Sequence, residues 1–352
     1  MVLSSKLRAE SDALAPPASS KQLLEVRDLE VTFDLPSGLV PAVQGVSLTV
    51  AVGETVAIVG ESGSGKSVTA RAIMGLLPPK TSRISGSVRF EGNELLGLSN
   101  KQLRKYRGKD LAIVFQDPMR SLNPTMRVGD QLVEAMRVHL PVSREEARGR
   151  VTELLQRVRI PSAKQRFTEY PHQLSGGMRQ RVMIAMALSC GPKLVIADEP
   201  TTALDVTTQA QIMELLAELQ VEFKMAIILI SHDMGLAASF TDTVAVMYSG
   251  RLVERAPTEE LFGNMRMPYT KALLESIPRM DQPSMEPLPV IEGAPPDPRS
   301  QPPGCAFSPR CSYAKDHCVE ERPPLTDEGT GHAWACWYPL SSPVGEGHAA
   351  RK

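Results

Sequence analysis

The sequence of 352 residues lacks any uninterrupted apolar run of the roughly 18 residues that a helix needs to cross a bilayer. It also lacks the contiguous apolar segment near the N-terminus that marks a secreted protein. Neither sign of charge is in excess, because the formal net charge is −1 and the isoelectric point is about 6.6, which gives no bulk attraction to nucleic acid. We therefore expect a soluble chain that reaches a membrane only through protein partners and does not bind nucleic acid.

Cysteine is also scarce, and its placement is uneven. Four of the five cysteines lie within residues 305–336, in the pattern C-x5-C-x6-C-x17-C, and Cys190 fits a small core residue. In a chain without a secretion signal, such a group favours metal binding over disulfides. The spacing matches neither a zinc ribbon nor a bacterial ferredoxin, so Zn²⁺, an iron-sulfur cluster and reduced structural thiols all stay open. His317 and His332 lie nearby and leave a mixed Cys/His zinc site open as well.

A phosphate-binding motif follows the strand-like residues 55–59. Residues 60–67 read GESGSGKS, a full match to G-x-x-x-x-G-K-S, and residues 68–77 favour a helix. The glycines let backbone amides wrap around phosphates, while Lys66 reaches the terminal phosphates and the Ser67 hydroxyl can ligate Mg²⁺. The agreement of strand, loop and helix argues against a chance glycine-rich turn and predicts a nucleotide site.

Two acids follow a second buried strand. Leu194–Ala197 is short and continuously apolar, and it leads directly into Asp198 and Glu199. Ligands of open α/β sheets bind at the carboxyl ends of the strands. We expect Asp198 to belong to the Mg²⁺ shell and Glu199 to orient and polarise the attacking water.

A third motif lies just upstream of that strand, at Leu174–Arg181, LSGGMRQR. Ser175, Gly176 and Gly177 leave the backbone bare at the start of a predicted helix that continues from Met178 to Leu188. The N-terminus of such a helix is an anion-binding site. A plain serine-capped helix is the alternative, and the two other motifs argue against it.

Together these motifs resemble the nucleotide-binding subunit of ATP-binding cassette (ABC) transporters over residues 22–265. Further family motifs occur in the family's order: Gln116 in VFQDP, the loop TTALD at 201–205, and His232 in ISHD. The resemblance implies an α/β P-loop NTPase cassette with a RecA-like parallel-sheet core, an antiparallel β subdomain and a helical subdomain at about 98–173. Each motif is weak alone, and order and spacing make the set specific.

The resemblance also implies a role for each matched position. ATP would contact an aromatic under adenine, the phosphate loop and the residue after it: Phe33, Gly60, Glu61, Ser62, Gly63, Ser64, Gly65, Lys66, Ser67 and Val68. Mg²⁺ would be held by Ser67, Gln116 and Asp198, with Glu199, His232 and Gln116 catalytic. A second, identical or homologous cassette would present its signature to this ATP, as this chain's would cover the partner's ATP: Leu174, Ser175, Gly176, Gly177 and Gln180. The dimer-contacting loop would comprise Ala203, Leu204 and Asp205.

The residues after Gln116 narrow the resemblance. Asp117–Pro124 reads DPMRSLNP, which is similar to the peptide and nickel importer branch, and its Asp-Pro and Asn-Pro pairs favour a shaped loop. In that branch the loop lies beside the groove for a membrane subunit. The implied partners are two permease subunits and, indirectly, a solute-binding protein, at the cytoplasmic face of the inner membrane. Other cargoes, such as a nickel chelate or an oligosaccharide, stay open.

The proline-rich tail supports the same branch. Residues 304–325 closely resemble the C-terminal extension of oligopeptide and dipeptide ABC ATPases, some of which carry a [4Fe-4S] cluster there. That resemblance implies four candidate ligands: Cys305, Cys311, Cys318 and Cys336. A DNA-repair or translation ATPase of this family usually carries an inserted coiled coil, tandem cassettes or basic stretches, which are missing here. A non-hydrolysing regulatory subunit is disfavoured by intact catalytic residues.

The expected domain organisation follows from these motifs. Residues 1–21 read as a disordered tail, 22–265 as the cassette, 266–345 as the cysteine-containing extension, and 346–352 as a second tail. The clearest expected elements, beyond those already given, are strands at 23–26, 31–33, 46–50, 87–90 and 225–230 and helices at 130–139, 144–158 and 207–223.

Overall fold

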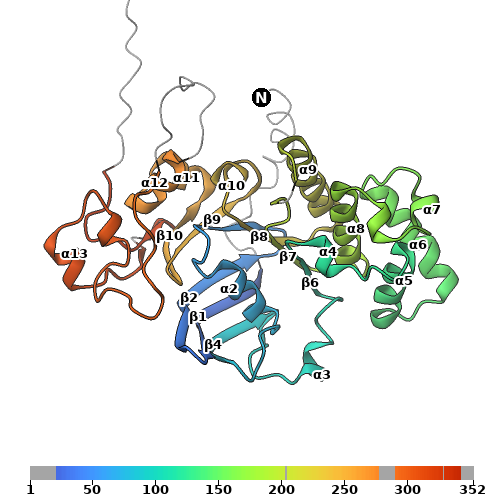
Figure 1. Ribbon diagram of the computed structural model, residues 1–352, viewed down its shortest axis with the longest axis horizontal. Coiled ribbons are helices and arrows are strands. Elements are labelled where there is room, and N and C mark those ends of the chain that lie inside the picture. The colour runs from blue at the N-terminus through green and yellow to red at the C-terminus, as the bar shows by residue number, and fades with distance from the viewer. Residues whose placement is uncertain (1–20, 203, 277–289, 328, 342–352) are drawn as a thin grey trace, which may run out of the picture.

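The computed structural model describes residues 21–202, 204–276, 290–327 and 329–341, so the expected tails fall almost wholly outside it. Within these residues the largest sheet has eight strands in the order β11-β12-β10-β9-β3-β8-β7-β6. Figure 1 labels its strands β6 to β10. The strands are β3 (Thr55–Val59), β6 (Leu111–Val114), β7 (Leu194–Asp198), β8 (Ala226–Ser231), β9 (Thr243–Tyr248), β10 (Arg251–Pro257), β11 (Thr326–Asp327) and β12 (Ala333–Trp334).

The centre of this sheet is parallel. Strands β9, β3, β8, β7 and β6 pair in parallel, whereas β10, β12 and β11 add antiparallel strands at one edge. Every residue of β3, β7 and β8 is buried, as their continuous apolar sequences predict for strands covered on both faces. The expected parallel core is confirmed, and the whole sheet is mixed.

A second sheet of four strands is antiparallel, in the order β2-β1-β4-β5. It comprises β1 (Gln22–Leu35), β2 (Gly38–Ala51), β4 (Ser82–Phe90) and β5 (Asn93–Glu94). The separate short strands expected here are parts of long ones: Leu35 pairs with Gly38 across a tight turn, and register shifts in β1 take up the irregular positions. Gly38 has a φ of +112°, which suits glycine at this turn.

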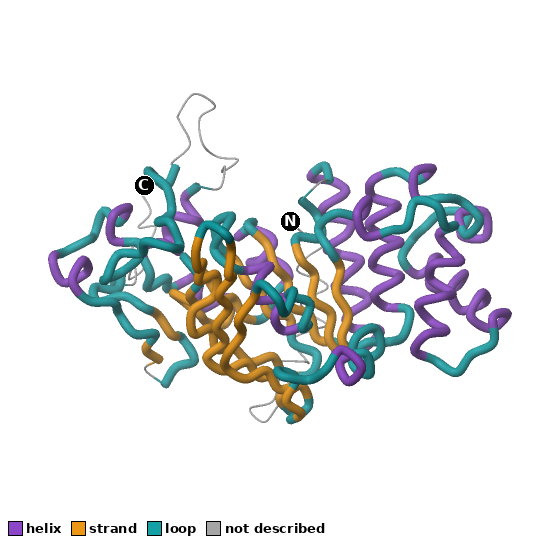
Figure 2. Tube along the Cα trace, turned by 60° about the horizontal axis from the view of Figure 1, so that its bottom comes forward, coloured by secondary structure: helices purple, strands orange, loops and turns teal. Residues whose placement is uncertain are grey.

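Helices flank both sheets and form a separate group at one end of the molecule (Figures 1 and 2). Their bounds are α2 (Lys66–Ile73), α3 (Asn100–Leu103), α4 (Pro118–Ser121), α5 (Val128–His139), α6 (Arg144–Arg157), α7 (Ala163–Arg166), α8 (Gly176–Leu188), α9 (Val206–Phe223), α10 (Met234–Phe240), α11 (Thr258–Gly263), α12 (Pro268–Glu275) and α13 (Asp316–Glu320), with 3-10 turns at Pro171–Gln173 and Ser308–Arg310. The expected helices match within a few residues. Within the range of about 98–173 expected for the helical subdomain, Leu111–Val114 forms β6 at the edge of the large sheet, a strand that was not among the expected elements.

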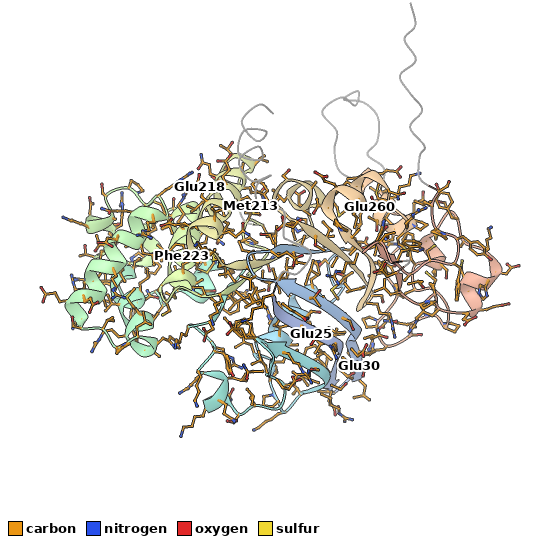
Figure 3. The ribbon with its side chains drawn as sticks, turned by 180° about the vertical axis from the view of Figure 1, so that it is seen from behind. Glu25, Glu30, Met213, Glu218, Phe223 and Glu260 are labelled. Carbon is orange, nitrogen blue, oxygen red and sulfur yellow. The ribbon has the colours of Figure 1, made fainter. Side chains whose placement is uncertain are left out.

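Alternate side chains of the parallel strands enter different cores. In β7, Val195 and Ala197 pack with α8 and α9, whereas Leu194 and Ile196 pack with α2 and the antiparallel sheet. Figure 3 shows α9 from behind, with Met213, Glu218 and Phe223 along it. No helix in the described part of the chain combines the length and apolarity that a membrane span requires.

A third core joins the C-terminal residues to the cassette. Ala57 and Val59 of β3 share it with Tyr248, Tyr269 and Phe307. The C-terminal strand β12 also pairs with β10, in register at Glu254 and Trp334. The cysteine-containing extension is therefore built onto the large sheet and shares its core.

Candidate functional site: a phosphate loop and a carboxylate centre

The phosphate loop connects β3 to α2, and its glycines pack tightly against the backbone of neighbouring strands. Gly65 has a φ of +104° and is the N-cap of α2. A Cβ at Gly60 would lie 2.2 Å from the Met247 carbonyl oxygen, and one at Gly65 would lie 2.6 Å from that of Ala42. Only glycine fits these two positions, so the loop backbone is held in the curved form that binds phosphates.

Lys66 lies at the centre of the loop. Its side chain is almost fully buried, and Nζ donates to the carbonyl oxygens of Gly60 at 2.8 Å and Glu61 at 2.9 Å. Burial lowers the pKa of Lys66, although the charges of Glu199, Asp198 and Glu61 act in the opposite direction. An ammonium so desolvated interacts strongly with any phosphate that enters the loop.

Two serines of the loop carry hydroxyls suited to a nucleotide and its metal. Ser67 Oγ donates to Asp198 Oδ1 at 2.7 Å, which joins the loop to the end of β7. Ser64 Oγ is buried and has no hydrogen-bond partner among the described residues. Burial raises the pKa of Asp198, while the bond from Ser67 works against that rise. The unpaired hydroxyl and the buried oxygen donors fit ATP with Mg²⁺.

Glu199 is the meeting point of the remaining catalytic candidates. Its Oε2 accepts from Gln116 Nε2 at 2.8 Å and from Thr202 Oγ1 at 2.9 Å, and His232 Nδ1 lies 3.7 Å from it. Glu199 has a φ of +48°, in the left-handed region that a non-glycine residue adopts only under constraint. Glu199 and His232 directly follow β7 and β8, and Gln116 lies just after β6, so three parallel strands deliver these residues to one sheet edge.

Comparisons with known proteins agree with this geometry. A family model described as ABC transporter matches residues 43–202, and one described as Oligopeptide/dipeptide transporter, C-terminal region matches residues 253–318. The oligopeptide transport ATP-binding protein OppD of Salmonella typhimurium is 50% identical over 328 residues, covering 93% of this chain and 97% of that protein. The chain belongs to the ABC transporter family.

Two further comparisons describe the same ABC cassette. The dipeptide transport ATP-binding protein DppD of Bacillus subtilis is 49% identical over 90% of this chain and 95% of that protein. The dimeric structure of the ATP-binding cassette MJ0796 in a post-hydrolysis state, bound to ADP and Pi, aligns with a TM-score of 0.61 and 29% identity. It covers 67% of this chain and 99% of that one. The fold expected from the resemblance is confirmed.

The signature of this ABC cassette lies away from its own phosphate loop. Ser175 is the N-cap of α8, and its Oγ accepts from the Met178 amide at 3.3 Å. Helix α8 packs on β6, and β7 and β8 lie between β6 and the strand that carries the phosphate loop. Gln180 is buried, and its Nε2 has no hydrogen-bond partner in the described residues.

The other residues expected to contact nucleotide or partner are placed as follows. Phe33 lies on β1 and packs against the core of the antiparallel sheet, as does Val68 on α2. In the loop after Glu199, Leu204 packs against the helical core, and Asp205 caps α9 by accepting from the Thr208 amide at 2.9 Å. Ala203 lies outside the described residues.

The loop after Gln116 is held in a defined shape. Asp117 caps α4 by accepting from the Met119 amide at 2.8 Å. Gln131 of α5 accepts from the Asn123 amide at 2.9 Å and donates to the carbonyls of Asn123 and Met126 at 3.0 Å. Met119 is half exposed and contacts Arg179 of the signature helix.

The four tail cysteines line one cavity together with Met267, Phe307 and Trp337: Cys305, Cys311, Cys318 and Cys336. Burial raises the pKa of Cys305 and Cys311, and it raises that of Cys336 to about 11. Within the described residues, no three His, Cys, Asp or Glu side chains are grouped closely enough to hold a single metal ion. Of the two histidines that left a mixed Cys/His zinc site open, His332 lies against Glu254 and is buried beside β10, and His317 lies 3.8 Å from Glu321.

Several residues of the site have no motif that reveals them. Thr202 stands in the expected loop, but its bond to Glu199 is visible only in the structure. Tyr269 Oη accepts from the Glu61 amide at 2.9 Å, and Arg310 pairs with the Glu61 carboxylate. These partners are 208 and 249 residues apart in the chain, so no local pattern records them.

Proposed function

We propose that this chain is the ATP-hydrolysing subunit that energises import of di- or oligopeptides through an ABC transporter. The observation that carries the proposal is the convergence of Gln116, Thr202 and His232 on Glu199, next to the phosphate loop. About 50% identity to proteins named for oligopeptide and dipeptide transport supports the cargo class. A nickel chelate or an oligosaccharide is the alternative cargo.

The chain's own residues divide the reaction between them. The amides of residues 60–67 and the Lys66 ammonium would bind the phosphates, and Phe33 would lie beneath adenine. Ser67, Asp198 and Gln116 would hold Mg²⁺, which supplies charge neutralisation at the phosphates when bound. Glu199, oriented by Gln116 and Thr202, would accept a proton from the attacking water, and His232 would donate a hydrogen bond to the terminal phosphate.

The position of the signature supports a two-cassette active site. Since β7 and β8 separate α8 from the phosphate loop, Ser175–Gly177 would cover the ATP of a second cassette, with Leu204 and Asp205 at the contact. The MJ0796 cassette, which is dimeric and bound to ADP and Pi, supports the pairing of two cassettes. Hydrolysis would then open the dimer.

The shaped loop at Asp117–Met126 would transmit this opening. It connects Gln116 to α5 and presents the exposed Met119, so a membrane subunit docked there would respond to the state of Glu199. The partners would be two permeases at the cytoplasmic face of the inner membrane, with a solute-binding protein on the other side.

A glutamate variant tests the catalytic assignment. In the assembled transporter, Glu199→Gln keeps the hydrogen-bonding shape but removes the base, so ATP binding persists while turnover falls by about 10²–10⁴-fold. The matched control is Glu153→Gln on the exposed face of α6, which keeps normal turnover. Near wild-type hydrolysis by Glu199→Gln would refute the assignment.

We further propose an iron-sulfur cluster on Cys305, Cys311, Cys318 and Cys336, with Zn²⁺ as the alternative. The support is that four sulfur donors line one cavity, the donor set that an iron-sulfur cluster requires. Ligation would deprotonate thiols whose pKa burial raises, so binding would release protons.

Metal analysis of the purified protein distinguishes an iron-sulfur cluster from Zn²⁺. Anaerobically purified protein is expected to contain iron and acid-labile sulfide and to absorb visible light. The Cys318→Ser variant loses the iron, while Cys190→Ser, which changes the cysteine outside the cavity, retains it. A colourless protein with stoichiometric zinc would contradict the cluster.

A further inference from the structure

An arginine of the C-terminal extension forms a bidentate ion pair with a residue of the phosphate loop. Arg310 ends a 3-10 turn between two of the cavity cysteines, and its side chain is only 4% exposed. Its Nη1 and Nη2 donate to the Glu61 carboxylate at 2.7 and 2.9 Å. Its other donors meet the carbonyls of Ile291 and Glu292 and the Tyr248 hydroxyl. This fork-to-fork geometry is the strong form of an Arg–carboxylate pair.

Two more contacts from the extension reach the same loop. The Glu61 amide donates to Tyr269 Oη, so both the backbone and the side chain of Glu61 are fixed by C-terminal residues. Gln301 Nε2 donates to the carbonyl and hydroxyl oxygens of Ser249, and the next residue, Gly250, donates its amide to the Ser64 carbonyl. The extension thus supports the loop at Glu61 directly and at Ser64 through one intermediate.

The negative charge of Glu61 determines how its contact with Arg310 affects phosphate binding. Glu61 is the first residue after Gly60 in the phosphate loop, and its charge acts on Lys66. An anionic side chain there opposes the binding of a polyphosphate unless a cation neutralises it. Arg310 is that cation, and its hydrogen bonds to Glu61 raise the pKa of the guanidinium above its ordinary value.

Packing joins this ion pair to the rest of the extension. Phe307, in the same short turn, packs against Tyr248 and Tyr269 with ring centroids 5.4 and 5.2 Å apart. Phe307 also lines the cysteine cavity. One turn of chain therefore connects the cavity wall at Phe307 to the ion pair between Arg310 and Glu61.

We propose that Arg310 is a positioning residue through which the C-terminal extension sets the affinity of the phosphate loop for ATP, by neutralising and fixing Glu61. This inference rests on the proposed function, since it assumes that the loop binds ATP. Arg310 acts through Glu61 of the loop, so its effect falls on ATP binding and spares the chemical step.

The test compares MgATP binding to the full-length wild type and charge variants. Arg310→Gln leaves the Glu61 carboxylate without its cation and weakens ATP binding by about tenfold, a typical coupling between contacting charged groups. Glu61→Gln removes the opposing charge and binds ATP more tightly than the wild type. The double variant Glu61→Gln/Arg310→Gln recovers affinity to within about threefold of the wild type, because no uncompensated charge remains.

A matched control and two kinetic readouts separate this role from a general loss of structure. Arg299 also belongs to the extension, but it pairs with Asp297 in its own turn, so Arg299→Gln binds ATP as the wild type does. In the assembled transporter, Arg310→Gln raises the KM for ATP and leaves kcat unchanged. Arg310→Lys, which keeps the charge, restores most of the affinity.

The chain's two tryptophans add an optical readout, because Trp334 and Trp337 both lie in the extension. MgATP changes their emission in the wild type and does not in Arg310→Gln at saturating MgATP. Equal affinities of wild type and Arg310→Gln would overturn the inference, as would a double variant as weak as the single one. If Arg310→Gln does not fold, weaker binding by Glu61→Gln overturns it. A wild-type chain that binds no ATP would instead refute the proposed function.

Discussion

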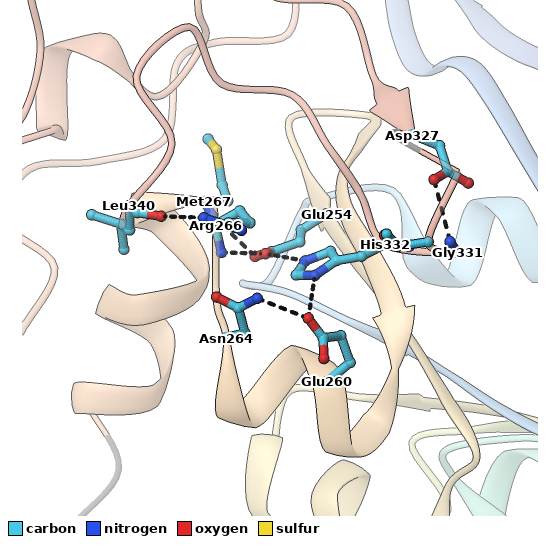
Figure 4. A network of polar contacts seen from close by, with 10 residues as sticks. Glu254, Glu260, Asn264, Arg266, Met267, Asp327, Gly331, His332 and Leu340 are labelled. Carbon is cyan, nitrogen blue, oxygen red and sulfur yellow. Dashed lines mark hydrogen bonds and ion pairs between the residues drawn. The ribbon is translucent and has the colours of Figure 1, made fainter. Parts of the chain in front are cut away.

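At the scale of single residues, His332 is a buried polar group outside the phosphate site that is held from two sides. Figure 4 shows it between Glu254 of β10 and Glu260 of α11. Its Nε2 lies 2.9 Å from Glu254 Oε1 and its Nδ1 lies 3.4 Å from Glu260 Oε1. Burial acts to lower the pKa of His332, but the hydrogen bonds and charges of the two carboxylates outweigh it, and the pKa is raised. When it is protonated, His332 links the extension to the cassette through both carboxylates.

This arrangement predicts a pH-dependent stability. Since the folded pKa of His332 exceeds its ordinary 6.5, the folded state binds the proton more tightly, and the stabilisation is complete below that value and is lost as the pH rises through the folded pKa. His332→Gln keeps a hydrogen bond but not the charge, so it is less stable than the wild type by about 2 kcal/mol near pH 6. The difference in stability between the two proteins becomes smaller at higher pH. Thermal unfolding of the wild type and His332→Gln from pH 5.5 to 9 measures this difference.

His139 provides the opposite control. Burial lowers its pKa, so its protonation favours the unfolded chain, and His139→Gln is expected to gain stability relative to the wild type as the pH falls. A His332→Gln deficit that is constant or grows with rising pH would contradict the assignment of a charged His332.

Residue-level predictions from sequence succeeded where a motif carried them. The order of motifs gave Gln116, Glu199 and His232 catalytic roles, and the structure brings all three together. Arg310 and His332 could not be predicted, because the partner of each lies on a distant element and arises from the packing of the extension. Arg310 and His332 can form their ion pairs only after the extension has folded onto the cassette.

At the scale of elements, the packing of the helical group includes a very close contact between a helix backbone and an aromatic ring. Gly129 in α5 lies against the Phe167 ring, and a Cβ built on it would be 2.2 Å from ring carbon. Gly149 in α6 faces open space. These two helical glycines therefore differ in function: the first makes room for an aromatic ring, and the second only costs helix propensity.

Alanine substitution is expected to have opposite effects at the two positions. Gly129→Ala destabilises by about 1–3 kcal/mol, because the ring or the helix must move in a packed core. Gly149→Ala stabilises by about 0.5–1 kcal/mol, since alanine loses less backbone entropy in a helix. Denaturant midpoints followed by circular dichroism measure both. Equal shifts of the same sign would show that Phe167 does not constrain α5.

Element prediction worked best for strands buried on both faces. The bounds of β7 and β8 were predicted within one residue, because their apolar runs are uninterrupted. Strand β6 was missed, since its four residues lie within a charged stretch of helical character and only pairing with β7 makes them a strand. The merging of short strands into β1 and β2 likewise depends on pairing partners.

At the scale of the whole molecule, the cassette and the extension form a continuous structure. The expected boundary at residues 265 and 266 separates two regions of different composition, yet β12 pairs with β10 across it, and Phe307 shares a core with residues of β3. Composition showed that the tail is different, but it could not show where the tail docks. That information lies in the tertiary contacts of the third core.

The distance along the chain between Glu61 and Arg310 has a consequence for the timing of synthesis. Ribosomes add about 5–20 residues per second, so the 249 residues between these partners take on the order of 10–50 seconds to make. During that interval the nascent phosphate loop carries an unneutralised carboxylate and lacks the support of Tyr269 for most of the time. A newly synthesised cassette therefore completes the contacts of its phosphate loop only after its C-terminal segment has left the ribosome. A polypeptide that ends before Arg310 never forms the ion pair with Glu61.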